Sequence, residues 1–122
     1  MSHIVTLTTE VRDQAAVAAA CRRLNLPEPV EGTVQLYSGQ ASGLLVHLTD
    51  WLYPVVIDPS TGTVRYDNYG GVWGDEQHLH RFVQAYVVER SRIEARKKSY
   101  ATTEQSLADG SIMVEIEVGG QA

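Results

Sequence analysis

The sequence predicts an α+β fold in which an antiparallel sheet carries two helices packed on one face, a two-layer sandwich related to the ferredoxin-like arrangement. Three observations support this prediction. Two segments repeat apolar residues at helical spacing, several short β-branched segments lie between turn signals, and the last two strands flank an Asp-Gly pair. The 122 residues suit one domain, residues 1–122, which is long enough to bury a core.

The N-terminal part of the chain predicts one strand and one helix. Residues 3–9 are rich in β-branched types and favour a strand. Asp13 can cap a helix that runs to about Leu24, and Pro27 stops it soon afterwards. Cys21 falls on the apolar stripe of this helix, so we expect a core residue rather than a reactive thiol.

Four antiparallel strands are predicted next, separated by turn residues. They cover residues 33–38, 43–49, 53–57 and 63–67. Alternation along these strands predicts one apolar and one largely polar sheet face. The apolar face is expected to hold Val34, Leu36, Leu44, Val46, Leu48, Val55, Ile57, Val64 and Tyr66. The polar face is expected to hold Gln35, Tyr37, His47, Thr49, Arg65 and Asp67.

The C-terminal part predicts a long helix and a hairpin. The helix runs from near Asp75 to Lys98, and its cationic last turn suits the negative end of the helix dipole. Strands at 101–107 and 111–118 flank the turn signal Asp109-Gly110. The residues expected to face the core are Ile112, Val114, Ile116 and Val118.

Charge and hydropathy argue against two classes of partner. No apolar run approaches the roughly 20 residues that cross a bilayer, and the start lacks a signal-peptide pattern, so we expect a cytoplasmic protein that does not bind a membrane. The net charge is -5, and residues 89–98, with five cations and two anions, hold a local excess of positive charge. We expect this segment to be a solvated helix end rather than a nucleic-acid site.

Residues with catalytic or metal-binding chemistry do not form a recognisable set. His78 and His80 are two apart and diverge around a helix, so they cannot share one ion. The glycines of Gly70-Gly71-x-x-Gly74 precede two carboxylates that would repel a phosphate, which favours a turn and an acidic helix cap. We therefore expect no metal, no cofactor and no catalytic residues, and we favour a non-enzymatic chain over the alternative of an enzyme.

Aromatic side chains suggest two alternative binding sites. The apolar hairpin tip Trp51-Leu52-Tyr53-Pro54 is predicted to be a protein interface, because large apolar side chains at a turn are costly to leave in water. The alternative is a ligand site on the polar sheet face and the loop 66–74. Its residues would be Tyr37, His47, Arg65, Tyr69 and Trp73.

The order and spacing of several landmarks resemble the hypothetical chloroplast reading frame thirty-five family, a domain of unknown function from plastids, cyanobacteria and other bacteria. The landmarks are Met1-Ser2-His3, Asp13, Tyr37, the segment 66–74, Phe82, Gln84, Tyr86 and Asp109-Gly110-Ser111-Ile112. The chain departs from the family pattern at residues 51–54 and in its basic helix end. The resemblance implies no activity, but family members are often encoded beside ATPases of the AAA type, which implies such an ATPase as a partner.

The sequence thus predicts a small non-enzymatic binding or adaptor domain that self-associates or docks on a larger protein. The alternative is a ligand-binding or enzymatic domain that uses the polar sheet face and the loop 66–74.

Overall fold

The computed structural model describes residues 4–98 and 101–117, and it confirms the predicted α+β class. The elements in chain order are β1 (Val5–Leu7), α1 (Gln14–Arg23), β2 (Val30–Leu36), β3 (Gly39–Val46), β4 (Val55–Asp58), β5 (Thr63–Tyr66), the 3-10 turn η1 (Tyr69–Gly71), α2 (Glu76–Lys97), β6 (Ala101–Ser106) and β7 (Ile112–Glu117). Both predicted helix starts are confirmed, because the Asp13 carboxylate accepts from the Ala16 amide and the Asp75 carboxylate accepts from the Gln77 amide.

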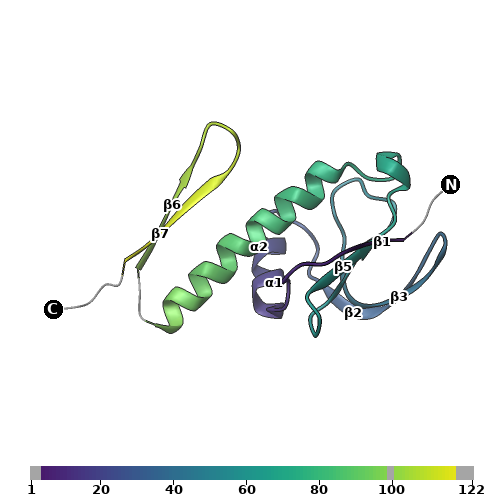
Figure 1. Ribbon diagram of the computed structural model, residues 1–122, viewed down its shortest axis with the longest axis horizontal. Coiled ribbons are helices and arrows are strands. Elements are labelled where there is room, and N and C mark those ends of the chain that lie inside the picture. The colour runs from purple at the N-terminus through teal and green to yellow at the C-terminus, as the bar shows by residue number, and fades with distance from the viewer. Residues whose placement is uncertain (1–3, 99–100, 118–122) are drawn as a thin grey trace.

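The first five strands form one antiparallel sheet in the order β1-β5-β4-β3-β2. Helices α1 and α2 pack together against one face of this sheet (Figure 1). The main core lies between the two layers, and Cys21 and Phe82 are completely buried in it. The predicted core role of Cys21 is therefore confirmed.

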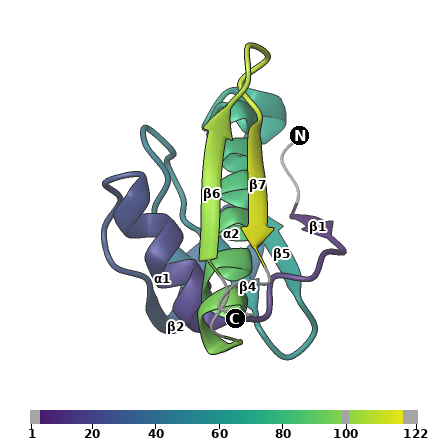
Figure 2. The same cartoon turned by 90° about the vertical axis from the view of Figure 1, so that its left-hand side faces the viewer.

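Strands β6 and β7 form a separate two-stranded sheet on the opposite side of α2, so that α2 lies between two sheets (Figure 2). The predicted turn is confirmed, with Gly110 at a φ of 89°. Ile112 and Val114 are half-buried, whereas Ile116 is 47% exposed, contrary to its predicted core position. Val118 lies outside the described residues. A small hairpin buries little surface of its own, so its position depends on contacts with α1 and α2.

One carboxylate ties this hairpin to both helices. Glu104 on β6 accepts hydrogen bonds from Arg23 of α1 at 2.5 Å and from Arg92 of α2. Desolvation opposes ionisation of Glu104, but these charged donors outweigh it and lower its pKa. At the other end of the hairpin, the Gln84 amide donates to the Gly110 carbonyl at 3.0 Å.

The sheet face turned away from the helices is apolar as well, which corrects the prediction of a largely polar face. Its core is a cluster of Leu36, Ala41 and Val56, covered by Ile4, Val34, Leu45 and Tyr53. Val34 and Leu36 were predicted on the other face, but Val34 pairs with Ala41 and Leu36 with Gly39. This register places both side chains on the face that carries Val56.

The cluster also shows that the sheet curls. Ile4 directly precedes β1, and Leu36 ends β2, so these residues belong to opposite edges of the sheet. They nevertheless pack in one cluster, and a Cβ on Gly39 would lie 3.6 Å from Ile4 Cδ1. Gly43 is essential to this shape, because a Cβ there would lie 2.3 Å from the Ile57 carbonyl oxygen. The curl brings the β2–β3 turn to the end of β5.

Candidate functional site: an aromatic surface around Trp73

Trp73 is the centre of an aromatic cluster at the end of the molecule where the curled sheet meets α2. Tyr69 stacks on it with ring centroids 4.8 Å apart and an interplanar angle of 24°. Tyr37 lies 5.3 Å away in a tilted arrangement, and Tyr53 lies 5.8 Å away edge-on. These are the distances at which aromatic pairs attract each other. The four rings come from three different connections of the chain.

The loop between β5 and α2 presents Tyr69 and Trp73 by satisfying its own polar groups. The buried Asn68 accepts the amides of Gly71 and Trp73 through its carbonyl and donates its side-chain amide to the Gly74 carbonyl at 3.1 Å. Tyr69, Gly70 and Gly71 all have positive φ, at 49°, 62° and 100°. This conformation is why glycines occupy two of these positions.

A buried carboxylate connects this loop to the β2–β3 turn. Asp67 is 1% exposed, and its oxygens accept from the Tyr69 amide and from the Ser38 hydroxyl, both at 3.4 Å. Ser38 follows Tyr37 in the turn that the curl brings close. The contact therefore holds Tyr37 beside Trp73.

The predicted interface Trp51-Leu52-Tyr53-Pro54 lies against the same loop, but its side chains have different environments. Trp51 folds back: its ring packs edge-on against Tyr66 at 5.6 Å, and its indole N–H donates to the Asp75 carbonyl at 3.0 Å. Pro54 is buried. Tyr53 is half-buried between Trp73 and the second apolar cluster. Of the four residues, Leu52 is the exposed one, at 61%.

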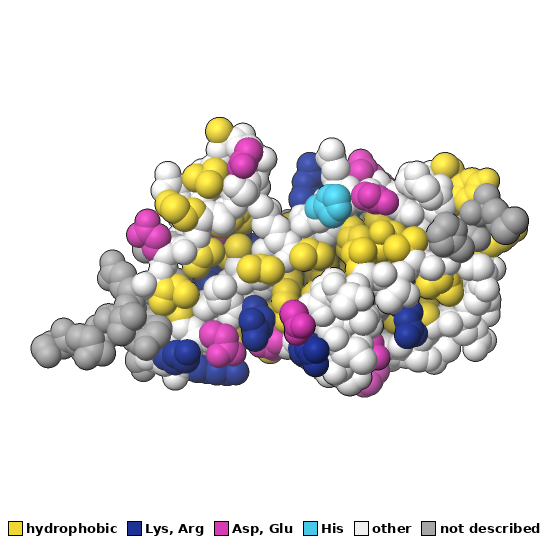
Figure 3. Space-filling view, in the orientation of Figure 1, with side chains coloured by type: hydrophobic (Ala, Val, Ile, Leu, Met, Phe, Trp, Pro, Cys, Tyr) yellow, Lys and Arg dark blue, Asp and Glu magenta, His cyan; other side chains and the backbone are white. Residues whose placement is uncertain are grey.

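The two sites predicted separately therefore meet in one surface. The Leu52 amide donates to the Trp73 carbonyl at 2.9 Å, which fixes one loop on the other. We call the aromatic surface the set Tyr37, Leu52, Tyr53, Tyr69, Val72 and Trp73. Hydrophobic side chains are visible over η1, at the upper right of Figure 3. Val72, which is 71% exposed, was missed in the sequence, although an apolar residue inside a glycine-rich loop is a usable signal.

His47 and Arg65 of the predicted ligand face do not join this surface. His47 is exposed just after β3, and Arg65 is exposed on β5, where it pairs in register with Val56. Within the described residues, neither side chain takes part in the ring contacts around Trp73. The polar groups of the predicted ligand site therefore do not converge.

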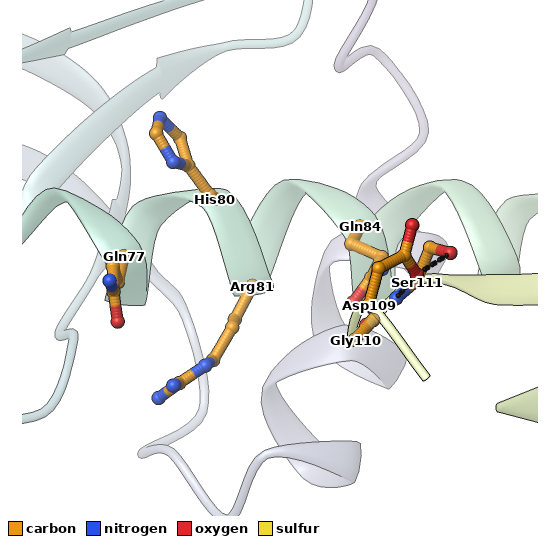
Figure 4. A pocket seen from close by; sticks show the side chains of 7 residues that line it. All are labelled: Gln77, His80, Arg81, Gln84, Asp109, Gly110 and Ser111. Atoms are coloured by element: carbon orange, nitrogen blue, oxygen red, sulfur yellow. Dashed lines mark hydrogen bonds between the residues drawn. The ribbon is translucent and has the colours of Figure 1, made fainter. Parts of the chain in front are cut away.

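A wide hollow of about 400 Å³ lies between α2 and the tip of the β6–β7 hairpin. Its lining includes His80, Arg81, Asp109 and Ser111, and Figure 4 shows His80 and Arg81 pointing in different directions. Two hydrogen bonds from Ser111, both accepted by Oδ1 of Asp109, lower the pKa of that carboxyl group. The polar side chains of this hollow therefore do not converge on one point where they could bind a ligand.

His78, His80 and Cys21 are arranged as predicted. His78 and His80 line different hollows. His80 lies in the hollow beside the β6–β7 hairpin, whereas His78 lines another hollow with Leu24 and Leu48. Residues 4–98 and 101–117 contain no group of three or more side chains suited to a metal ion. Burial raises the pKa of the Cys21 thiol to about 11, so this thiol is neutral at physiological pH.

Comparisons with known proteins give no relative: the chain matches no family model, no curated protein and no solved structure. The resemblance to the hypothetical chloroplast reading frame thirty-five family thus stays a prediction. Over the described ranges, no helix combines the length and apolarity needed to cross a membrane.

Proposed function

We propose that this protein is a small non-enzymatic binding or adaptor domain that uses the aromatic surface to bind a protein, either a second copy or a larger partner. The observation that carries the proposal is the exposure of large apolar side chains on a rigid base. Tyr37 is 64% exposed, Leu52 61% and Val72 71%, whereas the loops beneath them are held by hydrogen bonds, including one from Ser38 to the buried Asp67.

A rigid apolar base favours binding because little conformational entropy is lost when a partner covers it. Aromatic rings add area with few rotatable bonds, and such residues dominate the energy of many interfaces. Trp73, half-buried and held by three other rings, suits the centre of such a contact. Its neighbours Leu52 and Val72 would become buried with it.

The larger partner that we propose is an ATPase of the AAA type, in the cytoplasm. This part of the proposal rests on the resemblance described above and on no contact in the molecule. The ligand-binding alternative shares Tyr37, Tyr69 and Trp73 with the proposed surface. We favour a protein partner because His47 and Arg65, the polar groups that the alternative needs, lie apart from the rings.

The test uses two exposed residues whose loss should not disturb the fold. Leu52→Ser with Val72→Ser removes the apolar rim of the surface. Val30→Ser with Val87→Ser is the matched control, because these valines are 59% and 55% exposed elsewhere. Self-association is measured by sedimentation velocity, and binding to a purified AAA-type ATPase is measured by biolayer interferometry.

We expect the Leu52/Val72 variant to lose at least one of the two interactions, while the control variant retains both. Circular dichroism should show the same folded spectrum for both variants. An intact interaction in the Leu52/Val72 variant, equal losses in the two variants, or a wild-type protein that binds neither itself nor the ATPase would contradict the proposal.

A further inference from the structure

The charges of this protein are strongly separated along the chain. Residues 24–80 contain seven acidic residues and one cation, Arg65, so their net charge is 1 - 7 = -6 with neutral histidines. Residues 81–98 contain six cations and two acidic residues, for a net charge of 6 - 2 = +4. The first segment contributes every residue of the aromatic surface, and the second is most of α2.

Acidic residues lie close in the chain to the aromatic surface, since Asp50 is two residues before Leu52 and Asp75 is two residues after Trp73. Asp50, Asp75 and Glu76 are all exposed. Asp50 directly precedes Trp51, and the Asp75 carbonyl accepts the Trp51 indole N–H. Burial raises the pKa of the Tyr66 phenol, and the nearby charge of Glu76 adds to that rise. The surface therefore offers apolar rings beside negative charge.

The other end of α2 offers the complementary chemistry. Arg96, Lys97 and Lys98 are exposed at its last turn, and we call them the cationic end. Part of the positive charge before them is used internally, because Arg92 holds Glu104. Glu94 lies 3.5 Å from Lys97, which partly compensates the charge of that one residue.

The aromatic surface and the cationic end cannot meet within one molecule. Helix α2 has 22 residues, which at 1.5 Å per residue separates its ends by about 33 Å. Figure 3 shows Lys and Arg gathered at the lower left, over the C-terminal end of α2, and hydrophobic side chains at the upper right. Complementary groups fixed at opposite ends of a molecule can pair between two molecules.

We propose that the cationic end of one copy docks on the aromatic surface of a second copy. The guanidinium of Arg96 would stack on the ring of Tyr37 or Trp73, as arginine does on exposed aromatic faces. Lys97 and Lys98 would pair with Asp75 and Glu76. This inference names a partner for the proposed function and rests on it.

The contact is heterologous, because each copy contributes a different patch to it. Such contacts are not self-limiting: they add copies head to tail and give open chains, or rings where the rotation closes. The contact is also partly electrostatic, so added salt should weaken it. Both properties separate it from a symmetric dimer formed by apolar contact alone.

A mixing experiment tests the proposal directly. The double variant Arg96→Glu with Lys98→Glu removes the cationic end and keeps the aromatic surface. The double variant Leu52→Ser with Val72→Ser removes the apolar rim of the aromatic surface and keeps the cationic end. Arg22→Glu with Arg81→Glu is the matched control, since it makes the same charge change at other exposed sites. Each protein is examined by sedimentation velocity at low ionic strength, at concentrations up to about 100 μM, after circular dichroism has verified its fold.

We expect the wild type and the Arg22/Arg81 control to form oligomers that dissociate as salt is added. Each of the other two variants should be monomeric alone. Their equimolar mixture should form a heterodimer and nothing larger, because it retains one intact surface and one intact cationic end per pair.

A monomeric wild type, a mixture that stays monomeric, or a cationic-end variant that still oligomerises would overturn this inference. The proposed function fails separately. If the wild type is monomeric but binds the AAA-type ATPase through Leu52 and Val72, the aromatic surface serves another protein and the second copy is the wrong partner. If it binds neither, both proposals fail.

Discussion

The indole of Trp51 lies directly on Gly74, so closely that a Cβ at residue 74 would be 2.3 Å from Trp51 Cδ2. Gly74 does not have a positive φ, so its backbone conformation does not require a glycine. The close packing of Trp51 is the reason that no side chain fits at this position. This contact, with the hydrogen bond from the indole to the Asp75 carbonyl, fixes the start of α2 to the β3–β4 loop.

We expect Gly74→Ala to destabilise the protein by about 1–3 kcal/mol, because the indole must move or the backbone must shift. Denaturant unfolding measures the loss, and tryptophan fluorescence should report a more polar indole environment. Gly32→Ala is the matched control, because its Cβ would meet Leu45 Cδ1 at an ordinary 3.7 Å. Equal stability of the two variants would contradict the close contact.

The hydroxyl of Tyr86 holds the connection between β1 and α1. It accepts the amides of Arg12 and Asp13 at 3.1 and 3.0 Å and donates to the Glu10 carbonyl at 3.3 Å. Tyr86→Phe should cost about 2 kcal/mol, because it leaves these amides without an acceptor. Hydrogen exchange of the two amides should accelerate.

Tyr37→Phe serves as the control for this substitution, because the Tyr37 ring is largely exposed and should tolerate loss of its hydroxyl within about 0.5 kcal/mol. Unchanged amide protection at Arg12 and Asp13 in the Tyr86 variant would show that the hydroxyl does not organise this connection.

Attachment of the β6–β7 hairpin should depend on pH through Glu104. Its folded pKa is lowered, so its stabilising contribution is complete above the ordinary value of 4.5 and is lost as the pH falls through the lower folded value. Hydrogen exchange of residues 104–116 should therefore speed up in acid before the main core unfolds.

The variant Glu104→Gln tests whether the Glu104 carboxylate causes this pH dependence. We expect it to weaken hairpin attachment at neutral pH by about 2 kcal/mol, because hydrogen bonds to a charged group are lost. It should also remove most of the acid dependence of the hairpin. A hairpin whose protection is the same from pH 6 to pH 3 in the wild type would refute the role of Glu104.

The buried thiol of Cys21 should be unreactive in the native protein. Its pKa is raised to about 11, so the reactive thiolate is scarce at pH 8, and the side chain is completely buried. Iodoacetamide should label it only after denaturation, as mass spectrometry would show. Rapid labelling without denaturant would mean that the core between α1 and the sheet opens readily.

Local signals explain which parts of the fold were predictable. The caps Asp13 and Asp75 and the turn at Asp109-Gly110 act within a few residues, and all three formed as expected. The predicted sheet face of Leu36 was wrong for a different reason. Alternation tells which residues of one strand share a face, but the turn sets the register that matches this face to those of the neighbouring strands. The observed turn is Tyr37-Ser38, one residue earlier than Ser-Gly-Gln suggests.

The aromatic site was only half predictable for a similar reason. Residue type alone points to Leu52, Tyr69 and Trp73 as binding residues. That the predicted sites form one surface depends on the curl of the sheet, which brings Ser38 to Asp67. The half-buried position of Trp51 depends on Gly74, more than 20 residues away in the chain, and nothing in the local pattern around Trp51 reveals that glycine. Long-range contacts of this kind decide which aromatic ring is left for a partner.

The position of β1 at the edge beside β5 has a consequence for biosynthesis. Val5 pairs with Tyr66, and α1 and three strands lie between them in the chain. While the ribosome makes the protein, β1 therefore remains without its neighbour until β5 has been translated. Folding that waits for such distant pairings is slow, so the nascent segment must stay free of aggregation throughout that interval.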